Sequence, residues 1–289
     1  MIFYDSKLCT DVIECGRDKV ALGCYELSPD GTKHGSISIF DGGLENGPSN
    51  VYTTDAVLDM KWSDDGILYV ATNSRGIAVL DDAGHVSYSD KSIPQVCLSL
   101  VLYDQTVCTS TSSGNLLFYD KASLALTREL SCHSLETWCV AKGAGKLLYT
   151  GADDGLFRGW DVDSSESVFV NKSHGAGVCS ILCLSDTLLL TGSYDKKLRF
   201  WDPRSILKPI QELSVNGGVW RLAAFPDKKR IVAACMRDGF HVFEQNSCGD
   251  WSPLKHENFG DLAYGCSVRS NDTIFTCSFY NRQAQQWNV

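Results

Sequence analysis

The sequence repeats itself about every 41 residues, and this period constrains the fold more than any other feature of the chain. Two segments are plainly alike, LLYTGADDGLFRGWDVD at 147–163 and LLLTGSYDKKLRFWDPR at 188–204. Each reads as an apolar strand, a turn containing Gly and Asp, and a second strand that ends in Trp-Asp. The aromatic or apolar residue at this ending recurs at Phe40, Leu80, Tyr119, Trp160, Trp201, Phe243 and Trp287. Seven units of this kind account for all 289 residues.

Each unit is predicted to hold four short strands. In the fifth unit these are 177–181, 187–193, 197–202 and 209–213. Short runs of apolar or alternating residues, punctuated by Asp, Gly and Asn, are typical of strands and turns. No stretch shows a sustained helical apolar period. A four-stranded unit of roughly 40–45 residues with a Trp-Asp ending resembles the blade of a WD-repeat protein. The fold class expected is all-β, a seven-bladed WD-repeat β-propeller forming a single domain over residues 1–289, with blades ending near residues 40, 80, 119, 160, 201, 243 and 287.

The two ends of the chain are predicted to meet in one blade. Only Asn288 and Val289 follow Trp287, so the seventh unit lacks its outermost strand. The segment IFY at 2–4 is strand-like and precedes the first unit. We expect it to supply the missing strand, because this pairing closes the ring and removes an exposed sheet edge.

WD-repeat blades commonly hold a hydrogen-bonded set of His, Ser or Thr, Asp and Trp. The members expected here are His174, Ser193, Asp195 and Trp201 in the fifth unit, and His133, Asp154 and Trp160 in the fourth. A Ser, a His and an Asp also resemble a catalytic triad. Because successive blades reuse the set to hold a turn, the structural interpretation is favoured.

Composition excludes several classes of function. Asp and Glu number 35 against 26 Lys and Arg, a balance that disfavours nucleic acid as a partner. The 13 cysteines lie mostly in apolar runs without a CxxC pair, which indicates buried, reduced thiols. No His, Asp or Glu cluster has the spacing of a metal site, so neither a metal nor another cofactor is expected. We expect a soluble, cytoplasmic monomer that does not bind membranes, because Asp5 and Lys7 interrupt any signal peptide and the longest apolar run, 96–103, is too short to span a bilayer.

Several strings go beyond the common blade pattern: CHSLETWCVA at 132–141, NGGVWRLAAFP at 216–226, AACMRDGFHVF at 233–243, LAYGCS at 262–267 and TCSFYNRQAQQW at 276–287. Together they resemble the diphthine methyl ester hydrolases, WD-repeat enzymes of diphthamide biosynthesis. The resemblance implies that the substrate is translation elongation factor 2. Its modified histidine would end in a methyl ester and a trimethylammonium group, and hydrolysis of the ester would give diphthine and methanol.

The loops that enter the innermost strands and the turns between second and third strands share one face of a propeller. Distinctive residues gather at these positions, and the turns contribute Asp153, Asp154, Tyr194, Asp195, Met236, Arg237 and Tyr280. A trimethylammonium group is best held by aromatic faces. Four side chains are predicted to form the substrate-binding cage, although each could instead pack between blades: Trp138, Trp220, Tyr264 and Tyr280.

The candidate catalytic residues lie on the same face. Arg221 could stabilise an oxyanion or form an ion pair between blades, and Cys235 could be a nucleophile or an inert buried thiol. His174, like His133, could be a general base or hold its blade turn. Asp153, the additional carboxylate in GADDG, is the better candidate for activating water. The chain has no Gly-x-Ser-x-Gly motif, which argues against an α/β-hydrolase mechanism.

A non-catalytic function is the main alternative. Trp201-Asp202-Pro203-Arg204 is a Trp-Asp-x-Arg motif. Some WD-repeat receptors use such a motif to dock on the adaptor of a cullin-type ubiquitin ligase. In the other interpretation, Arg204 pairs with a neighbouring acidic residue on the blade rim.

Overall fold

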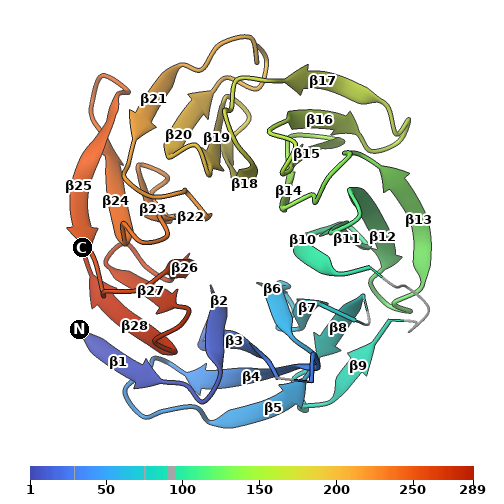
Figure 1. The fold of residues 1–289 in the computed structure, drawn as a ribbon, viewed down its shortest axis with the longest axis vertical. Coiled ribbons are helices and arrows are strands. Elements are labelled where there is room, and N and C mark those ends of the chain that lie inside the picture. The colour runs from blue at the N-terminus through green and yellow to red at the C-terminus, as the bar shows by residue number, and fades with distance from the viewer. Residues whose placement is uncertain (29, 75, 90–94) are drawn as a thin grey trace.

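The computed structural model describes residues 1–28, 30–74, 76–89 and 95–289, and its strands form a ring of seven four-stranded antiparallel sheets (Figure 1). Residues of the innermost strands line a central channel. The innermost strands are β2 (Cys9–Cys15), β6 (Val57–Trp62), β10 (Cys97–Tyr103), β14 (Cys139–Lys142), β18 (Val178–Ser185), β22 (Arg221–Ala224) and β26 (Ala263–Val268). The second strands are β3 (Lys19–Leu27), β7 (Leu68–Thr72), β11 (Thr106–Thr111), β15 (Leu147–Gly151), β19 (Leu188–Ser193), β23 (Arg230–Ala234) and β27 (Thr273–Ser278).

The third strands are β4 (Lys33–Asp41), β8 (Ile77–Leu80), β12 (Asn115–Asp120), β16 (Phe157–Asp161), β20 (Lys197–Trp201), β24 (Phe240–Gln245) and β28 (Gln283–Asn288). The outermost strands are β5 (Asn50–Thr54), β9 (Val86–Tyr88), β13 (Leu126–Ser131), β17 (Ser167–Asn171), β21 (Gln211–Ser214), β25 (Trp251–Glu257) and β1 (Ile2–Asp5). The predicted seven-bladed, all-β architecture is confirmed. Within the described ranges, the chain has no helix with the length and hydrophobicity that crossing a membrane requires.

The N-terminal strand closes the ring, as predicted. β1 runs antiparallel to β28, with Ile2 opposite Gln286 and Asp5 opposite Gln283. The seventh sheet therefore combines both ends of the chain, and Figure 1 shows the two termini next to each other. Closure leaves the last blade with a full set of four strands, so β28 is not an open edge.

The repeating residues of the sequence occupy one equivalent place. Each lies on the third strand of its sheet and is almost completely buried: Phe40, Leu80, Tyr119, Trp160, Trp201, Phe243 and Trp287. Seven apolar clusters fill the spaces between neighbouring sheets. One of them joins Phe275 of the last sheet to Leu22 and Phe40 of the first. The ring is thus held by a core at every blade interface, including the interface where the chain ends meet.

The buried hydrogen-bonded set is present, but one member differs from the expectation. In the fifth blade, Thr191 Oγ1 lies 2.7 Å from His174 Nε2 and accepts a hydrogen bond from Trp201 Nε1 at 2.8 Å. His174 Nδ1 lies 3.3 Å from Asp195 Oδ2. The prediction that Ser193 supplies the hydroxyl is wrong, because Ser193 Oγ instead donates to the carbonyl of Ala176. Thr191 and Ser193 are two positions apart, so both side chains lie on the same face of β19 and only the structure distinguishes them.

Replacing Thr191 with valine is expected to lower the free energy of unfolding by about 2 kcal/mol. Valine keeps the shape of threonine but leaves two buried nitrogen atoms, one on His174 and one on Trp201, without their partner, and each buried unsatisfied group costs about 1–3 kcal/mol. Urea denaturation followed by tryptophan fluorescence measures the loss. Thr187→Val, at an exposed position of the same blade, is the matched control. Equal stabilities for the two variants would contradict the assignment.

Candidate functional site

Aromatic side chains from four blades meet beside the channel. The Trp138 and Trp220 rings lie 5.4 Å apart, and Tyr264 lies 5.1 Å from Trp220. Tyr194 meets the edge of Trp220 at 6.3 Å. Trp138 and Trp220 precede innermost strands, Tyr264 lies on β26, and Tyr194 lies in the turn between β19 and β20. Antiparallel blade geometry brings all of these positions to one face, as the sequence predicted.

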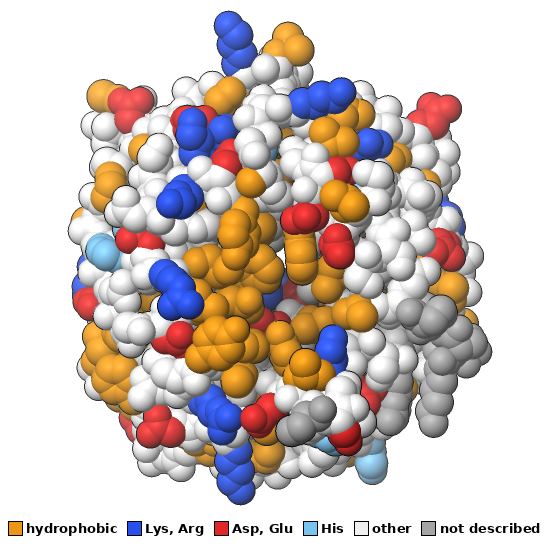
Figure 2. All heavy atoms as spheres, viewed as in Figure 1, with side chains coloured by type: hydrophobic (Ala, Val, Ile, Leu, Met, Phe, Trp, Pro, Cys, Tyr) orange, Lys and Arg blue, Asp and Glu red, His pale blue; other side chains and the backbone are white. Residues whose placement is uncertain are grey.

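These rings line a cavity of about 540 Å³. Its lining is Trp138, Asp153, Ala176, Gly177, Tyr194, Trp220, Met236 and Tyr264. Trp138 Nε1 donates a hydrogen bond to Asp153 Oδ1 at 3.1 Å, which fixes a carboxylate beside the ring. We call this group of four rings and Asp153 the aromatic cage. Figure 2 shows one face of the ring, on which hydrophobic side chains gather around a central hollow with charged side chains inside and beside it.

Two backbone features shape the wall of the cage. A Cβ atom at Gly177 would lie 2.8 Å from Asp153 Oδ1, so a larger residue at this position would displace that carboxylate. Met236 adopts a positive φ of 50°, a conformation that costs most side chains about 1–2 kcal/mol. The carbonyl of Met236 accepts a hydrogen bond from Ala263 N at 2.9 Å, and this contact holds the turn against β26.

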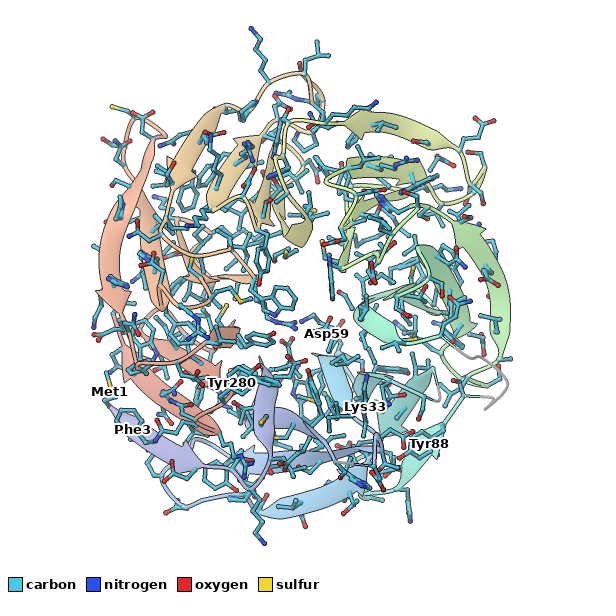
Figure 3. All side chains as sticks on the ribbon, viewed as in Figure 1. Met1, Phe3, Lys33, Asp59, Tyr88 and Tyr280 are labelled. Atoms are coloured by element: carbon cyan, nitrogen blue, oxygen red, sulfur yellow. The ribbon has the colours of Figure 1, made fainter. Side chains whose placement is uncertain are left out.

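Charged side chains line the channel next to the cage. The channel encloses about 690 Å³, and its charged lining includes Asp11, Glu14, Asp59, Lys61 and Arg221. Trp138, Trp220, Tyr264 and Arg221 line it as well, so three rings of the cage border both the cage cavity and the channel. Asp59 lies at the wall of the channel in Figure 3.

Arg221 reaches across the channel from the sixth blade to the second. Its Nη1 donates to Asp59 Oδ1 at 2.6 Å, and its Nη2 donates to the carbonyl of Leu58 at 3.2 Å. The second oxygen of Asp59 accepts from Ser99 Oγ and from the amide of Leu100. The alternative interpretation of Arg221 as an interblade ion pair is therefore what the structure shows. The guanidinium also lines the channel, where it keeps N–H groups available to a ligand.

The ion pair sets the charge of both partners. Burial raises the pKa of Asp59, but the charges of Arg221 and Lys61 outweigh this effect, and the net pKa of Asp59 is lowered. Burial lowers the pKa of Arg221, yet Asp59 and Asp11 raise it to a net value above the usual range. Both groups are therefore charged at neutral pH.

Asp11 is the functional candidate that the sequence reasoning missed. It lies on β2 and is only 5% exposed, and it lines the channel. Burial raises the pKa of Asp11 to about 7, because Arg221 offsets only part of the desolvation and the negative charge of Asp59 adds to the rise. An acidic residue directly before the apolar pair Val12-Ile13, in a segment that forms a buried strand, is the signal in the sequence that points to such a site.

The structure groups some of the predicted cage residues and separates one. Trp138, Trp220 and Tyr264 lie together as expected, and Tyr194 completes the group. Tyr280 does not line the cavity; it is 64% exposed and contacts the edge of Phe279 at 5.0 Å. Figure 3 shows Tyr280 farther from the channel than Asp59. Its placement in the cage is therefore corrected.

Two predicted catalytic residues lie elsewhere. The His174 side chain is enclosed by Thr191, Asp195 and Arg199, and burial lowers the pKa of its imidazole. Cys235 is completely buried in the core between the fifth and sixth blades, and burial raises the pKa of its thiol well above the usual value. Neither side chain lines the cavity or the channel. The general-base prediction for His174 and the nucleophile prediction for Cys235 are corrected on this ground.

Cys235→Ala is expected to leave turnover of the substrate proposed below within about twofold of the wild-type value, because the thiol cannot reach a bound ligand. Mass spectrometry of the substrate measures the turnover, and a thermal melting curve measures the stability of the variant. The melting temperature is expected to fall slightly, since the smaller side chain leaves a small cavity in the core. A loss of turnover at an unchanged melting temperature would restore the nucleophile interpretation.

The 13 cysteines are free, and all but Cys9, Cys15, Cys183 and Cys248 are buried. This confirms the expectation of buried thiols for most of them. Five cysteines line the channel: Cys15, Cys139, Cys179, Cys183 and Cys266. The Sγ of Cys266 lies 3.6 Å from the carbonyl oxygen of Arg221. Burial raises the pKa of Cys266 to about 12, so it is a neutral packing residue.

Three potential metal ligands lie together in the sixth blade, away from the cage. Asp238, His241 and His256 offer ligand atoms within 4.8 Å of one another. The two imidazole rings are stacked at 4.2 Å with 12° between their planes. Nitrogen lone pairs lie in the ring planes, so stacked rings direct them side by side instead of toward one ion. Asp238 also accepts the amide of Asn216 at 2.8 Å, and we assign the group to the blade turn.

In the Trp-Asp-x-Arg motif, the arginine forms an ion pair with the aspartate of the same motif. Arg204 Nη2 donates to Asp202 Oδ2 at 2.6 Å, and Arg204 Nε donates to Asp202 Oδ1 at 2.9 Å. The interpretation in which Arg204 pairs with a neighbouring acidic residue matches this geometry. Docking on a ligase adaptor stays a prediction.

Comparisons with known proteins agree with the fold and with the sequence resemblance. A family model described as WD domain, G-beta repeat matches residues 165–202. Diphthine methyltransferase of Mus musculus is 34% identical, with 73% of this chain and 53% of that protein covered. The diphthine methyltransferase homolog of Dictyostelium discoideum is 27% identical, with 82% of this chain and 77% of that protein covered. The chain spans about half the length of the mouse and human proteins.

A solved structure supports the fold alone. A chain in the crystal structure of the mitotic checkpoint complex superimposes with a TM-score of 0.81 and 18% sequence identity. The match covers 100% of this chain and 91% of that chain. At this identity the likeness carries no information on substrate or mechanism.

Proposed function

Because this chain belongs to the WD-repeat proteins of the diphthine methyltransferase type, we propose that it acts in diphthamide biosynthesis. The proposed reaction is hydrolysis of the methyl ester of diphthine methyl ester on translation elongation factor 2, giving diphthine and methanol. The observation that carries the proposal is an aromatic cage whose rings Trp138, Trp220 and Tyr264 also line the channel that holds Asp11 and Arg221. We place the reaction in the cytoplasm, where this elongation factor works.

The cage matches one end of the proposed substrate. A trimethylammonium group cannot donate a conventional hydrogen bond, so aromatic faces and a nearby negative charge must bind it. Trp138, Trp220 and Tyr264 supply the faces. Asp153, fixed by Trp138 Nε1, supplies the charge. We therefore assign Asp153 to charge complementarity, in place of the water activation expected from the sequence.

Arg221 matches the other group of the substrate. The ester and the ammonium share one end of the modified histidine side chain, so the ester carbonyl must lie close to the cage. Arg221 directly follows Trp220 and lines the adjoining channel. Its guanidinium is held by Asp59 and can donate to the carbonyl oxygen as negative charge develops there.

The names of the relatives describe methyl transfer, whereas the reaction proposed here is ester hydrolysis. An experiment must therefore distinguish the two reactions. A methyl donor such as S-adenosylmethionine carries a sulfonium cation, which an aromatic cage also attracts. Transfer adds one CH₂ unit to the mass of the protein substrate, whereas hydrolysis removes one. The direction of the mass change therefore separates the two reactions.

The test uses the methyl-esterified elongation factor as substrate and intact-protein mass spectrometry as readout. Incubation with this protein is expected to remove the mass of one CH₂ unit and to release methanol without an added donor. A substrate whose mass stays unchanged would contradict the proposal. So would a mass gain on unesterified substrate that depends on S-adenosylmethionine.

The adaptor interpretation predicts a different outcome. Arg204→Ala changes an exposed residue that lies in neither the cage nor the channel. The ester hydrolase proposal expects unchanged turnover in this variant. Co-purification of the wild-type protein with a ligase adaptor, lost in Arg204→Ala, would support the alternative.

A further inference from the structure

We propose that Asp11 is the catalytic base that activates the attacking water, with Arg221 as the donor to the carbonyl oxygen. The inference rests on the proposed ester hydrolysis and deepens it, since it names the group that performs the chemistry.

Asp11 lines the channel together with Arg221 and the cage residues Trp138, Trp220 and Tyr264. It is on β2, whose neighbour in the ring is β26 with the cage residue Tyr264. The charge of Asp11 contributes to raising the pKa of Tyr264 and to raising that of Arg221, so Asp11 is close enough to interact electrostatically with both. A substrate with its ammonium in the cage would bring its ester toward this carboxyl.

Asp11 differs from the other acidic residues of the site in its hydrogen bonding. Asp59 uses both oxygens on Arg221, Ser99 and Leu100. Glu14 pairs with Lys61 at 3.0 Å. Among the described residues, the Asp11 carboxyl has neither a hydrogen bond nor an ion pair within 4 Å, although it is almost completely buried. A buried carboxyl in a channel without a protein partner is free to bind a water molecule.

Among the titratable groups that surround it, Asp11 is the one whose pKa lies near neutral pH. The titratable groups that face it are Arg221, Asp59, Tyr25, Tyr264, Cys24 and Cys277. Burial raises the pKa of both tyrosines and both thiols, so these four stay neutral at pH 7. Burial also raises the pKa of Asp11 to about 7, a suitable value for a base that must later return its proton.

The reaction balances without a cofactor. The Asp11 carboxylate takes one proton from water while the water oxygen bonds to the ester carbon. The carbonyl oxygen becomes an oxyanion that accepts hydrogen bonds from Arg221. When the bond between this carbon and the methoxy oxygen breaks, Asp11 returns the proton to the leaving oxygen, which departs as methanol. The carboxylic acid product then releases its remaining proton to solvent.

The decisive variant is Asp11→Asn, which keeps the shape of the side chain and removes the base. Turnover of the esterified elongation factor is expected to fall about 100-fold or more. Binding of a substrate analogue with an N-methyl amide in place of the ester is expected to stay within threefold of the wild-type affinity, measured by calorimetry. Asp250→Asn, at an exposed position in the sixth blade, is the matched control with wild-type turnover.

The pH dependence provides the readout that a structural role would not change. Because a base acts only when deprotonated, kcat/KM of the wild type is expected to rise tenfold per pH unit below about 7 and to level off above it. The residual activity of Asp11→Asn is expected to be independent of pH over this range.

Three results would overturn the inference: Asp11→Asn turnover within threefold of wild type, loss of analogue binding together with turnover, or an identical pH profile in wild type and variant. Inactivity of the wild-type protein on confirmed substrate is a separate outcome, which contradicts the proposed function itself.

Discussion

Trp220→Ala is expected to lower kcat/KM for the esterified elongation factor by about 100-fold without unfolding the protein. Trp220 is the central ring of the cage, since it contacts Trp138, Tyr194 and Tyr264. A desolvated cation–π contact contributes about 2 kcal/mol or more, which is roughly 30-fold in affinity. Alanine also removes apolar surface that would cover the three methyl groups of the substrate. The protein is expected to stay folded, because the Trp220 ring lines a cavity open to solvent and is not part of the core.

Two variants serve as controls for this prediction. Trp220→Phe keeps an aromatic face and should recover much of the activity. Tyr280→Ala removes an aromatic ring of the same face that does not line the cavity, so its effect should stay within about threefold. Steady-state kinetics with a circular dichroism check on folding distinguishes the outcomes. Equal effects of Trp220→Ala and Tyr280→Ala would show that the cage is placed wrongly.

Arg221→Met is expected to destabilise the protein by about 3–5 kcal/mol, because it leaves the buried Asp59 carboxylate without its counter-charge. Urea unfolding measures this loss. The double variant Arg221→Met with Asp59→Asn should recover most of the stability, since it removes both charges of the pair. It should not recover turnover, because the donor to the carbonyl oxygen is still absent.

This pair of variants separates structure from chemistry. A double variant that regains both stability and turnover would show that Arg221 is only a link between blades. A single variant as stable as the wild type would contradict the buried ion pair itself. Arg221→Lys is a further comparison, because lysine keeps the charge but lacks the fork that contacts Asp59 and the Leu58 carbonyl together.

The fold could be predicted from the sequence because a blade is a local structure. Each segment of about 41 residues carries its own strand pattern, and the residues at Trp160 and Trp201 mark the same position in successive sheets. Closure by residues 2–5 was predictable from the missing outermost strand of the last unit. The choice between Thr191 and Ser193 was not, since both are hydroxyl residues on one face of a strand.

The cage could be predicted in part for the same reason. The start of every innermost strand lies on one face of the ring, and this is where Trp138, Trp220 and Tyr264 lie. Tyr280 was misplaced because the sequence gives the loop but not the direction of the side chain.

The pair of Arg221 and Asp59 could not be predicted, because it joins positions 162 residues apart across the channel. The repeat gives the order of the blades around the ring but not which side chains meet across the channel, and Asp11 was missed for the same reason. His174 and Cys235 have plausible chemistry in the sequence, but only the structure shows them enclosed in a blade.

The central claim is that one cage holds the ammonium of the substrate while its ester lies at Asp11 and Arg221. A crystal structure of this protein with a peptide bearing the N-methyl amide analogue tests it most directly. We predict the trimethylammonium group between Trp138, Trp220 and Tyr264, with the amide oxygen at hydrogen-bond distance from Arg221 and a water molecule at the Asp11 carboxyl. An ammonium bound outside these three rings, or an amide directed away from the channel, would contradict the account.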